Sequence, residues 1–249
     1  MENHQQTVAA PLKFYSAWYC PFAQRAWMAL LHKEIPFEYI EVDPYRESRW
    51  WLEISRNRAK VPVIVAPAGN ASGSTTVIDS TRIVEYLEDL APHVNPLFPC
   101  KPNEKAEHRF WIDHINERVV PYLYRYLEAD QPGEYRDTSQ EALLEGVREL
   151  SNAMSPTGPF FNGTALTAVD LLLIPFAYRI DALLGHYRDF SLPIAGASWS
   201  RYQRWYESMC GTAIFQGTLK DPDHYRQRLI EHYLPYSQGK GQKDVTEVR

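Results

Sequence analysis

The spacing of hydrophobic and polar positions divides the chain into two parts of different character. In the first part, short apolar runs typical of strands alternate with amphipathic stretches of helical period. The predicted strands are Leu12–Ser16, Phe37–Val42, Val63–Ala66 and Thr76–Ile78; the predicted helices are Pro21–Lys33, Arg49–Ser55 and Thr81–Leu90, the last with Ser80 as its N-cap. This β-α-β-α-β-β-α order predicts a compact α/β domain.

Beyond a proline-rich stretch, every long segment has helical period. Ala91–Pro102 holds four prolines in twelve residues, which excludes a helix and suits a stiff linker. The helices predicted after it are Glu104–Ala129, Thr138–Met154, Ala168–Leu184, Trp199–Cys210 and Pro222–Tyr233. We therefore expect an α/β domain over residues 11–91, a linker over 92–102, an all-helical domain over 103–236 and a disordered tail over 237–249.

Composition and charge exclude several classes of function. Of the 249 residues, 45% are hydrophobic and 23% are charged, as in soluble globular proteins. The net charge of -5 provides no attraction to a phosphate backbone, so nucleic acid is not an expected partner. No apolar window is long enough to span a bilayer, and Met1–Ala10 lacks a signal-peptide pattern. We expect a cytoplasmic protein that does not bind membranes.

Metal and nucleotide motifs are missing from the sequence. The three cysteines, Cys20, Cys100 and Cys210, are too scattered for a disulfide framework or a zinc site, and no HExxH or paired CxxC occurs. The phosphate-binding patterns GxGxxG and GxxxxGK[ST] are also missing, as is the hydrolase pattern GxSxG. No metal cofactor is expected.

The segment Tyr19-Cys20-Pro21-Phe22-Ala23 places a cysteine between the first predicted strand and the first predicted helix. At a helix N-terminus, unpaired N–H groups and the positive end of the dipole lower a thiol pKa and favour the thiolate. Because the residue three positions later is Ala23, a disulfide formed on Cys20 would need an external thiol to resolve it. The alternative is a buried structural cysteine, which the strand-turn-proline-helix context disfavours.

Two further segments each allow a structural and a ligand-binding interpretation. Val61-Pro62 precedes the third predicted strand, and an X-Pro bond there is either an ordinary strand start or a cis peptide that exposes backbone to a ligand. Asp79-Ser80-Thr81 begins a helix, where it is either a simple cap or a site for a substrate carboxylate.

In this order and at these spacings, the three segments resemble the glutathione transferase family, specifically its omega class. The resemblance covers roughly Leu12–Tyr233. The matching positions are Cys20-Pro21-Phe22-Ala23, the cis-proline segment Val61-Pro62, Asp79-Ser80 in place of a Glu-Ser pair, and the capping box Thr167-Ala168-Val169-Asp170 followed by Pro175. The resemblance implies a thioredoxin-like N-terminal domain followed by an all-helical C-terminal domain.

The resemblance also implies glutathione as a co-substrate. Cys20 would form a mixed disulfide with it, and the backbone of Val61, beside Pro62, would pair with the cysteinyl amide. Ser80 would hold the γ-glutamyl carboxylate and Asp79 its ammonium group. Asp79 is one methylene shorter than the family's Glu, so we expect a weaker ammonium contact or one shared with a water.

Other positions carry roles by the same resemblance. Lys60 would face the glycyl carboxylate, and Phe22 would pack beneath the glutathione site. A second-substrate pocket is expected between the domains, beside the first long helix and the helix with Pro175. Its candidate residues are Trp111, His114, Tyr178 and Arg179. For Arg179 the alternative is a surface or ion-paired arginine, and for His114 it is a satisfied core or surface histidine.

With this resemblance, the sequence predicts a glutathione-dependent thiol transferase that reduces glutathione mixed disulfides. The resemblance implies dehydroascorbate and S-phenacyl-type glutathione adducts as related substrates. One alternative is an enzyme that conjugates glutathione to an electrophile or uses it to isomerise one in a biosynthetic pathway. Another is a non-catalytic, ligandin-like binding protein, since fold alone does not determine function. The resemblance also implies a homodimer.

Overall fold

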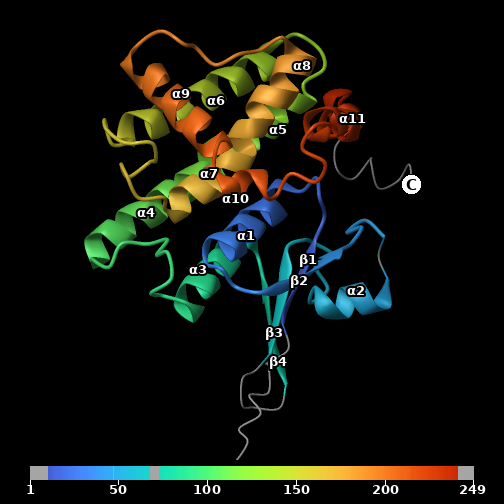
Figure 1. Ribbon diagram of the computed structural model, residues 1–249. Helices are drawn as coiled ribbons and strands as arrows, with labels where there is room; N and C mark the ends of the chain where they lie inside the picture. The colour runs from blue at the N-terminus through green and yellow to red at the C-terminus, as the bar shows by residue number, and fades with distance from the viewer. Residues whose placement is uncertain (1–10, 47, 68–72, 241–249) are drawn as a thin grey trace, which may run out of the picture. The chain divides into compact units, whose positions relative to one another are not determined.

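The computed structural model describes residues 11–46, 48–67 and 73–240, and the chain divides into two compact units, Met1–Ala91 and Pro92–Arg249 (Figure 1). The expectations for residues 1–10, 68–72 and 241–249 lie outside the described residues. The first unit contains β1 (Leu12–Ser16), α1 (Pro21–His32), β2 (Phe37–Glu41), α2 (Arg49–Ile54), β3 (Val63–Pro67), β4 (Ser74–Ile78) and α3 (Ser80–Leu90). The predicted β-α-β-α-β-β-α order is confirmed.

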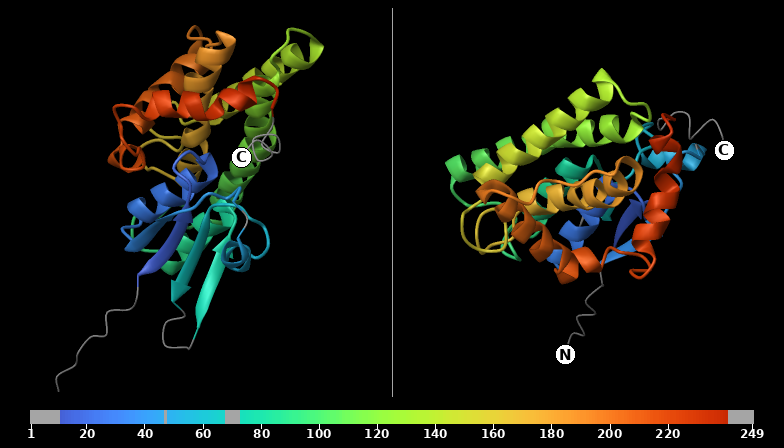
Figure 2. Two further views of the ribbon diagram at one scale, coloured as in Figure 1. Left: turned by 90° about the vertical axis from the view of Figure 1, so that its right-hand side faces the viewer. Right: turned by 90° about the horizontal axis from the view of Figure 1, so that it is seen from above.

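The strands of the first unit form one mixed sheet in the order β2-β1-β3-β4. β1 pairs parallel with β2 and antiparallel with β3, and β3 pairs antiparallel with β4. The side chains of Phe14, Val63 and Ile64 are fully buried in the core. Helices α1 and α3 lie on one face of this sheet and α2 lies on the other (Figures 1 and 2).

The second unit is all-helical, as predicted. Its elements are α4 (Pro102–His114), η1 (Ile115–Val119), α5 (Val120–Glu128), α6 (Glu134–Ala153), α7 (Ala168–Arg179), η2 (Ile180–Leu184), α8 (Gly185–Arg188), α9 (Ala197–Cys210), α10 (Ala213–Gln216) and α11 (Tyr225–Ser237). Helix α7 is the core of this unit, because all of its residues except Tyr178 are buried. The predicted capping box starts it: Thr167 and Asp170 satisfy each other's backbone N–H groups.

Several predicted boundaries are corrected by the structure. Asp79, and not Ser80, is the N-cap of α3, because its side chain accepts from Thr81 N and Arg82 N. Each of the two long predicted helices contains a π-helical segment, η1 or η2. The proline-rich stretch forms neither helix nor strand through Lys101. Helix α11 extends through Ser237, which was expected to begin the tail.

Candidate functional site

Cys20 lies between the first strand and the first helix. It is the N-cap of α1, with an extended backbone (φ -78°, ψ 117°), and Pro21 occupies the first helical position, where its missing N–H is tolerated. The turn is held by Cys20 N donating to Ala17 O at 2.9 Å and by Gln24 N donating to Cys20 O at 3.0 Å. The side chain of Cys20 is partly exposed, so it is open to reaction.

The sheet register brings Val61 next to this cysteine. Tyr15, near the end of β1, pairs with Val63 at the start of β3, so the chain entering β3 runs beside the chain leaving β1. The Val61-Pro62 bond is cis, as the family resemblance implied. The Cys20 thiol donates to Val61 O over a sulfur–oxygen distance of 3.9 Å.

The same register brings Asp79 to this edge of the sheet. Val63 also pairs with Ile78, the last residue of β4, and Asp79 follows directly. Its backbone has a φ of 74°, which is uncommon for a residue with a side chain. Oδ1 of Asp79 accepts from Thr81 N at 3.0 Å and from Arg82 N at 3.1 Å. The exposed carboxylate therefore caps α3.

A buried arginine supports this edge of the sheet. Arg25 on α1 is only 1% exposed, and its Nη1 donates to Ser80 Oγ at 3.4 Å. Its guanidinium carbon lies 5.3 Å from the ring centroid of Phe22, within cation–π range. Arg25 thus contacts two of the predicted glutathione-binding residues at once. The sequence analysis assigned it no role, although a cation on the buried face of an amphipathic helix was a usable signal.

A groove of about 450 Å³ lies at this edge of the sheet in the α/β unit. Its lining residues are Phe22, Arg58, Lys60, Val61, Pro62, Ile78, Asp79 and Ser80. Every residue predicted to bind glutathione therefore lines the same groove, and the sequence analysis missed Arg58 and Ile78. Arg58 and Lys60 are exposed cations and Asp79 is an exposed carboxylate. The groove can hold a small, extended molecule with charges of both signs.

The candidates for a second-substrate pocket belong to the helical unit, and the structure groups them in pairs. The rings of Trp111 and His114 lie 5.3 Å apart, and His114 Nε2 is 2.9 Å from Gly146 O. Arg179 is fully buried, and its guanidinium donates to Pro175 O at 2.7 Å.

Tyr178 and Arg179 both contact Tyr225. Arg179 Nη2 donates to the Tyr225 hydroxyl at 3.4 Å, and the ring centroids of Tyr178 and Tyr225 are 5.9 Å apart. In this arrangement the Arg179 guanidinium forms hydrogen bonds within its own unit. Among the helices that the structure describes, none is long and apolar enough to cross a membrane.

Sequence comparison finds similarity to one family in both units. Residues 19–90 match the model of the glutathione S-transferase N-terminal domain, and residues 111–208 match that of the glutathione S-transferase C-terminal domain. Glutathione S-transferase U2 of Arabidopsis thaliana is 31% identical over 171 residues, which is 66% of this chain and 70% of that protein. A probable chloroplastic glutathione S-transferase DHAR2 of Oryza sativa subsp. japonica is 27% identical over 190 residues, 76% of this chain. The chain spans 62% of the length of that rice protein.

Solved structures are similar over most of the chain. The crystal structure of glutathione transferase Omega 3C from Trametes versicolor is 28% identical with a TM-score of 0.74, covering 92% of this chain and 94% of that one. A Tau class glutathione S-transferase from mango, Mangifera indica, has a TM-score of 0.74 at 19% identity, covering 88% and 98%. At that identity the likeness concerns the fold alone.

Proposed function

Because this chain belongs to the glutathione S-transferase family, we propose that it is an omega-type, glutathione-dependent thiol transferase whose nucleophile is Cys20. One observation carries the proposal: Cys20 occupies the N-cap position of α1, and its thiol contacts the backbone of Val61, which lines the groove. The helix N-terminus stabilises a thiolate, which is the reactive form of cysteine. Similarity to the Omega 3C structure supports the assignment to the omega class.

The groove offers a partner for each polar group of glutathione. Ser80 accepts from Arg25, so its own hydroxyl proton remains to donate to the γ-glutamyl carboxylate. Oδ1 of Asp79 caps α3, and Oδ2 makes no hydrogen bond within the described part of the chain, which leaves it for the ammonium group. The glycyl carboxylate would lie against Lys60 and Arg58. Phe22 forms an apolar part of the groove wall between these polar contacts.

The backbone of Val61 links substrate binding to the cysteine. In this structure Val61 O accepts from the Cys20 thiol. In the proposed complex the cysteinyl amide of glutathione takes that carbonyl instead. This exchange removes the acceptor that holds the thiol proton and places the glutathione sulfur next to Sγ of Cys20.

The proposed reaction has two disulfide exchanges. The Cys20 thiolate attacks the glutathionyl sulfur of a mixed disulfide; the old S–S bond breaks, and the partner leaves as a thiolate that takes a proton from water. A glutathione thiolate then attacks the Cys20–glutathione disulfide, which releases oxidised glutathione and restores the Cys20 thiolate. Dehydroascorbate and S-phenacyl-type adducts of glutathione are further proposed substrates.

The residue type at position 20 favours reduction over conjugation. A Ser or Tyr hydroxyl can donate a hydrogen bond to a bound glutathione thiolate and so activate it for conjugation. A cysteine thiolate at the same place repels that anion and is instead suited to attack the sulfur of an existing glutathione disulfide, releasing the other sulfur as the leaving thiolate. Conjugation is therefore the lesser activity under this proposal.

The test compares wild type with Cys20→Ser in glutathione-dependent reduction of a small glutathione mixed disulfide. Aryl-halide conjugation is measured in parallel, and Cys100→Ser serves as the matched control because Cys100 is exposed and outside the groove. We expect Cys20→Ser to reduce no faster than the uncatalysed background and Cys100→Ser to match wild type. Mass spectrometry of wild type treated with oxidised glutathione should find one glutathione on Cys20.

Two results would reject the proposal. Undiminished disulfide reduction by Cys20→Ser would show that another group is the nucleophile. Conjugation that is fast in Cys20→Ser, with wild type poor in both assays, would show a different natural reaction. The homodimer is proposed from family membership, and a light-scattering mass near a single 28.9 kDa chain would contradict it.

A further inference from the structure

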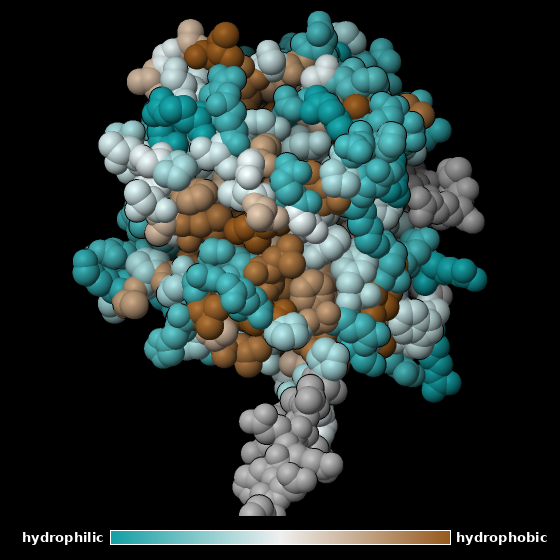
Figure 3. Space-filling model, viewed as in Figure 1, coloured by the Kyte–Doolittle hydropathy of each residue, from teal (hydrophilic) through white to brown (hydrophobic). Residues whose placement is uncertain are grey.

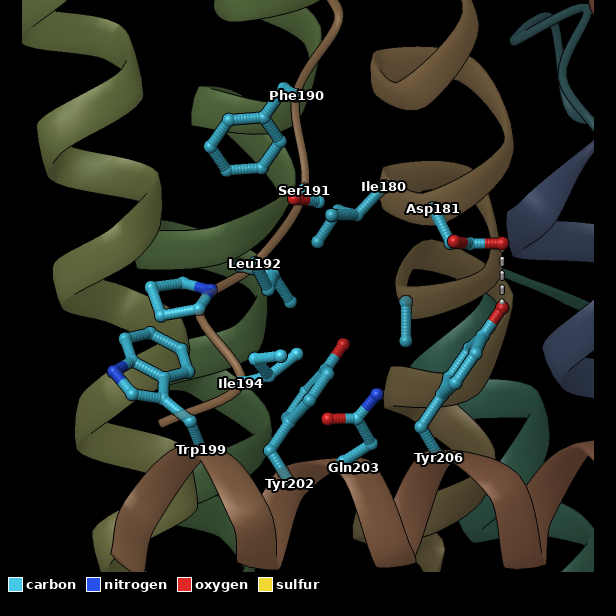
Figure 4. Close-up of a pocket in the computed structure, with 12 residues that line it drawn as sticks. Ile180, Asp181, Phe190, Ser191, Leu192, Ile194, Trp199, Tyr202, Gln203 and Tyr206 are labelled. Carbon is cyan, nitrogen blue, oxygen red and sulfur yellow. Dashed lines mark hydrogen bonds between the residues drawn. The ribbon is translucent and has the colours of Figure 1, made fainter. Parts of the chain in front are cut away.

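A small pocket lies within the helical unit, between the α7–η2 segment, the loop after α8, and α9 (Figure 4). Its volume is about 150 Å³ and its walls are largely apolar, with Ile180, Leu192, Ile194 and Trp199 among them. In the space-filling view, brown surface is visible where the loop between α8 and α9 runs (Figure 3). Ile194, in that loop, is 72% exposed, so apolar surface at the pocket mouth is open to water.

The polar groups of the pocket come mainly from one face of α9. Residues spaced by three, four and seven positions share a helix face, and Trp199, Tyr202, Gln203 and Tyr206 have this spacing. Figure 4 shows Tyr202, Gln203 and Tyr206 rising from α9 toward the side of Ile180 and Asp181, and Trp199 rising from α9 toward the loop at Leu192.

The hydroxyl group of Tyr202 has no hydrogen-bond partner among the described residues. The side chain is nevertheless held in place, because the residue is only 6% exposed and its ring lies 5.4 Å from that of Trp205. In Figure 4 the hydroxyl points into the pocket. A buried polar group without a partner is rare in folded proteins, and here it belongs to a residue that lines the pocket.

Tyr206, one turn later on α9, differs from Tyr202 in the hydrogen bonding of its hydroxyl group. Its ring is stacked parallel to that of Tyr202, with centroids 6.4 Å apart and an interplanar angle of 4°. Its hydroxyl, however, donates to Asp181 Oδ2 at 3.3 Å, and Arg226 Nη1 donates to the same oxygen at 2.6 Å. The charges of Asp181 and Arg226 are therefore already paired, whereas the buried hydroxyl of Tyr202 has no partner among the described residues.

These features define the chemistry of a ligand. A cavity of about 150 Å³ accommodates one six-membered ring, which matches the volume of this pocket. None of the described lining residues is Lys or Arg, so nothing in the pocket favours an anion. Burial raises the pKa of Tyr202 strongly, so its phenol is neutral at physiological pH and donates a proton. The ligand must supply an acceptor.

We propose that this pocket binds a neutral, single-ring aromatic molecule whose carbonyl oxygen accepts a hydrogen bond from the Tyr202 hydroxyl. The flat walls of Trp199 and Tyr202 would contact the ring faces, and Ile194 would be covered on binding. The binding site is independent of the groove beside Cys20, because it is built only from helices and a loop of the second unit.

The test uses acetophenone as the probe and ethylbenzene, which has nearly the same shape and no carbonyl group, as its comparison. Binding is followed by NMR with carbon-labelled isoleucine methyl groups, because Ile180 and Ile194 line this pocket and Ile78 lines the groove. Ile180→Val and Ile194→Val assign the two pocket signals. We expect acetophenone to shift both signals and to leave Ile78 unchanged, whereas glutathione should shift Ile78 alone.

The variant Tyr202→Phe removes only the hydroxyl. It should weaken acetophenone binding about tenfold, which corresponds to about 1.4 kcal/mol, and leave ethylbenzene binding unchanged. The matched control is Tyr206→Phe, which removes a neighbouring hydroxyl that is already bonded to Asp181 and should leave acetophenone affinity at the wild-type value. Since the Tyr202 hydroxyl has no partner among the described residues, its loss should not lower the melting temperature.

Three outcomes would overturn the inference. The first is no shift of Ile180 or Ile194 up to the solubility limit of acetophenone, which would make the pocket a water-filled hollow. The second is equal acetophenone affinity in wild type and Tyr202→Phe. The third is a shift of Ile78 alone, which would place the probe in the groove. None of these depends on whether Cys20 is the nucleophile, so the two proposals fail separately.

Discussion

Replacing Asp170 by Asn should strongly destabilise the helical unit. Asp170 is fully buried at the start of α7, and its carboxylate joins segments that are distant in sequence. Oδ1 accepts from Phe161 N at 2.6 Å and from Trp205 Nε1 at 2.8 Å. Oδ2 accepts from Thr167 N at 2.8 Å and from Thr167 Oγ1 at 2.9 Å. Each oxygen thus receives two donors.

An amide cannot replace this pattern in either orientation. The side chain of the Asp170→Asn variant would present one oxygen and one NH₂ group, so one pair of donors would face another donor. If the NH₂ faces Thr167, the threonine hydroxyl can rotate and accept, but the backbone N–H of Thr167 stays buried without a partner. Each buried hydrogen bond lost in this way costs about 1 to 3 kcal/mol, and bonds to a charged acceptor are the stronger ones.

We therefore expect Asp170→Asn to lower the free energy of unfolding by about 3 kcal/mol. For a chain of this size that corresponds to a fall in melting temperature of about 6 to 12 °C. Burial raises the pKa of Asp170, and the donors from Phe161, Thr167 and Trp205 oppose that rise. These hydrogen bonds therefore stabilise the buried carboxylate. In Asp170→Asn the donors no longer have a charged acceptor, so all of these hydrogen bonds are weakened or lost.

The assay is thermal unfolding followed by circular dichroism, with urea titration as a second measure. The matched control is Asp189→Asn, the same chemical change at an exposed residue with a φ of 48°, a conformation that Asn adopts readily. The control should stay within about 0.5 kcal/mol of wild type. If Asp170→Asn also does so, the hydrogen-bond argument is wrong.

Other predictions follow from single contacts. Arg25→Met should weaken glutathione binding about tenfold in calorimetry, because it removes the buried cation that donates to Ser80; unchanged affinity would refute a supporting role. Gly146→Ala should lower the unfolding free energy by about 1 to 2 kcal/mol, since the new methyl group would lie 2.6 Å from Arg118 O. Burial raises the pKa of the Cys210 thiol to about 11, so iodoacetamide at about pH 8, where roughly one Cys210 in a thousand is a thiolate, should label exposed Cys100 and spare Cys210. Raising the pH toward 11 should increase Cys210 labelling, as measured by peptide mass spectrometry.

The sequence predicted the strands and helices that are specified by residues close together in the chain. The strand Leu12–Ser16 and the helix from Pro21 are specified by apolar spacing and by proline at a first helical position, so both were predictable. The four-residue helix α8 spans only about one helical turn, which is too short for a repeating apolar pattern to identify it, so it was missed. Arg25 was also missed, because its partner Ser80 is 55 residues away and becomes its neighbour only on folding.

Asp79 shows how a departure from the family pattern can be consistent with the same site. Asp79 and Ser80 are adjacent, and both residue types are favoured as N-caps. In the structure Asp79 is the N-cap, because its backbone, with a φ of 74°, directs its side chain toward the first N–H groups of α3. A dihedral of this kind persists only where surrounding contacts hold it, and such positions cluster at ligand sites. The short side chain suits the cap, because Oδ1 reaches both Thr81 N and Arg82 N, whereas Glu is not among the preferred capping residues. With Oδ1 engaged by the helix, the carboxylate is fixed in place before a ligand arrives, and Oδ2 is the atom left to meet a cation. The Asp79 side chain reaches less far than a Glu side chain, but it also has less conformational freedom before binding. An ammonium contact at Asp79 therefore costs less side-chain entropy.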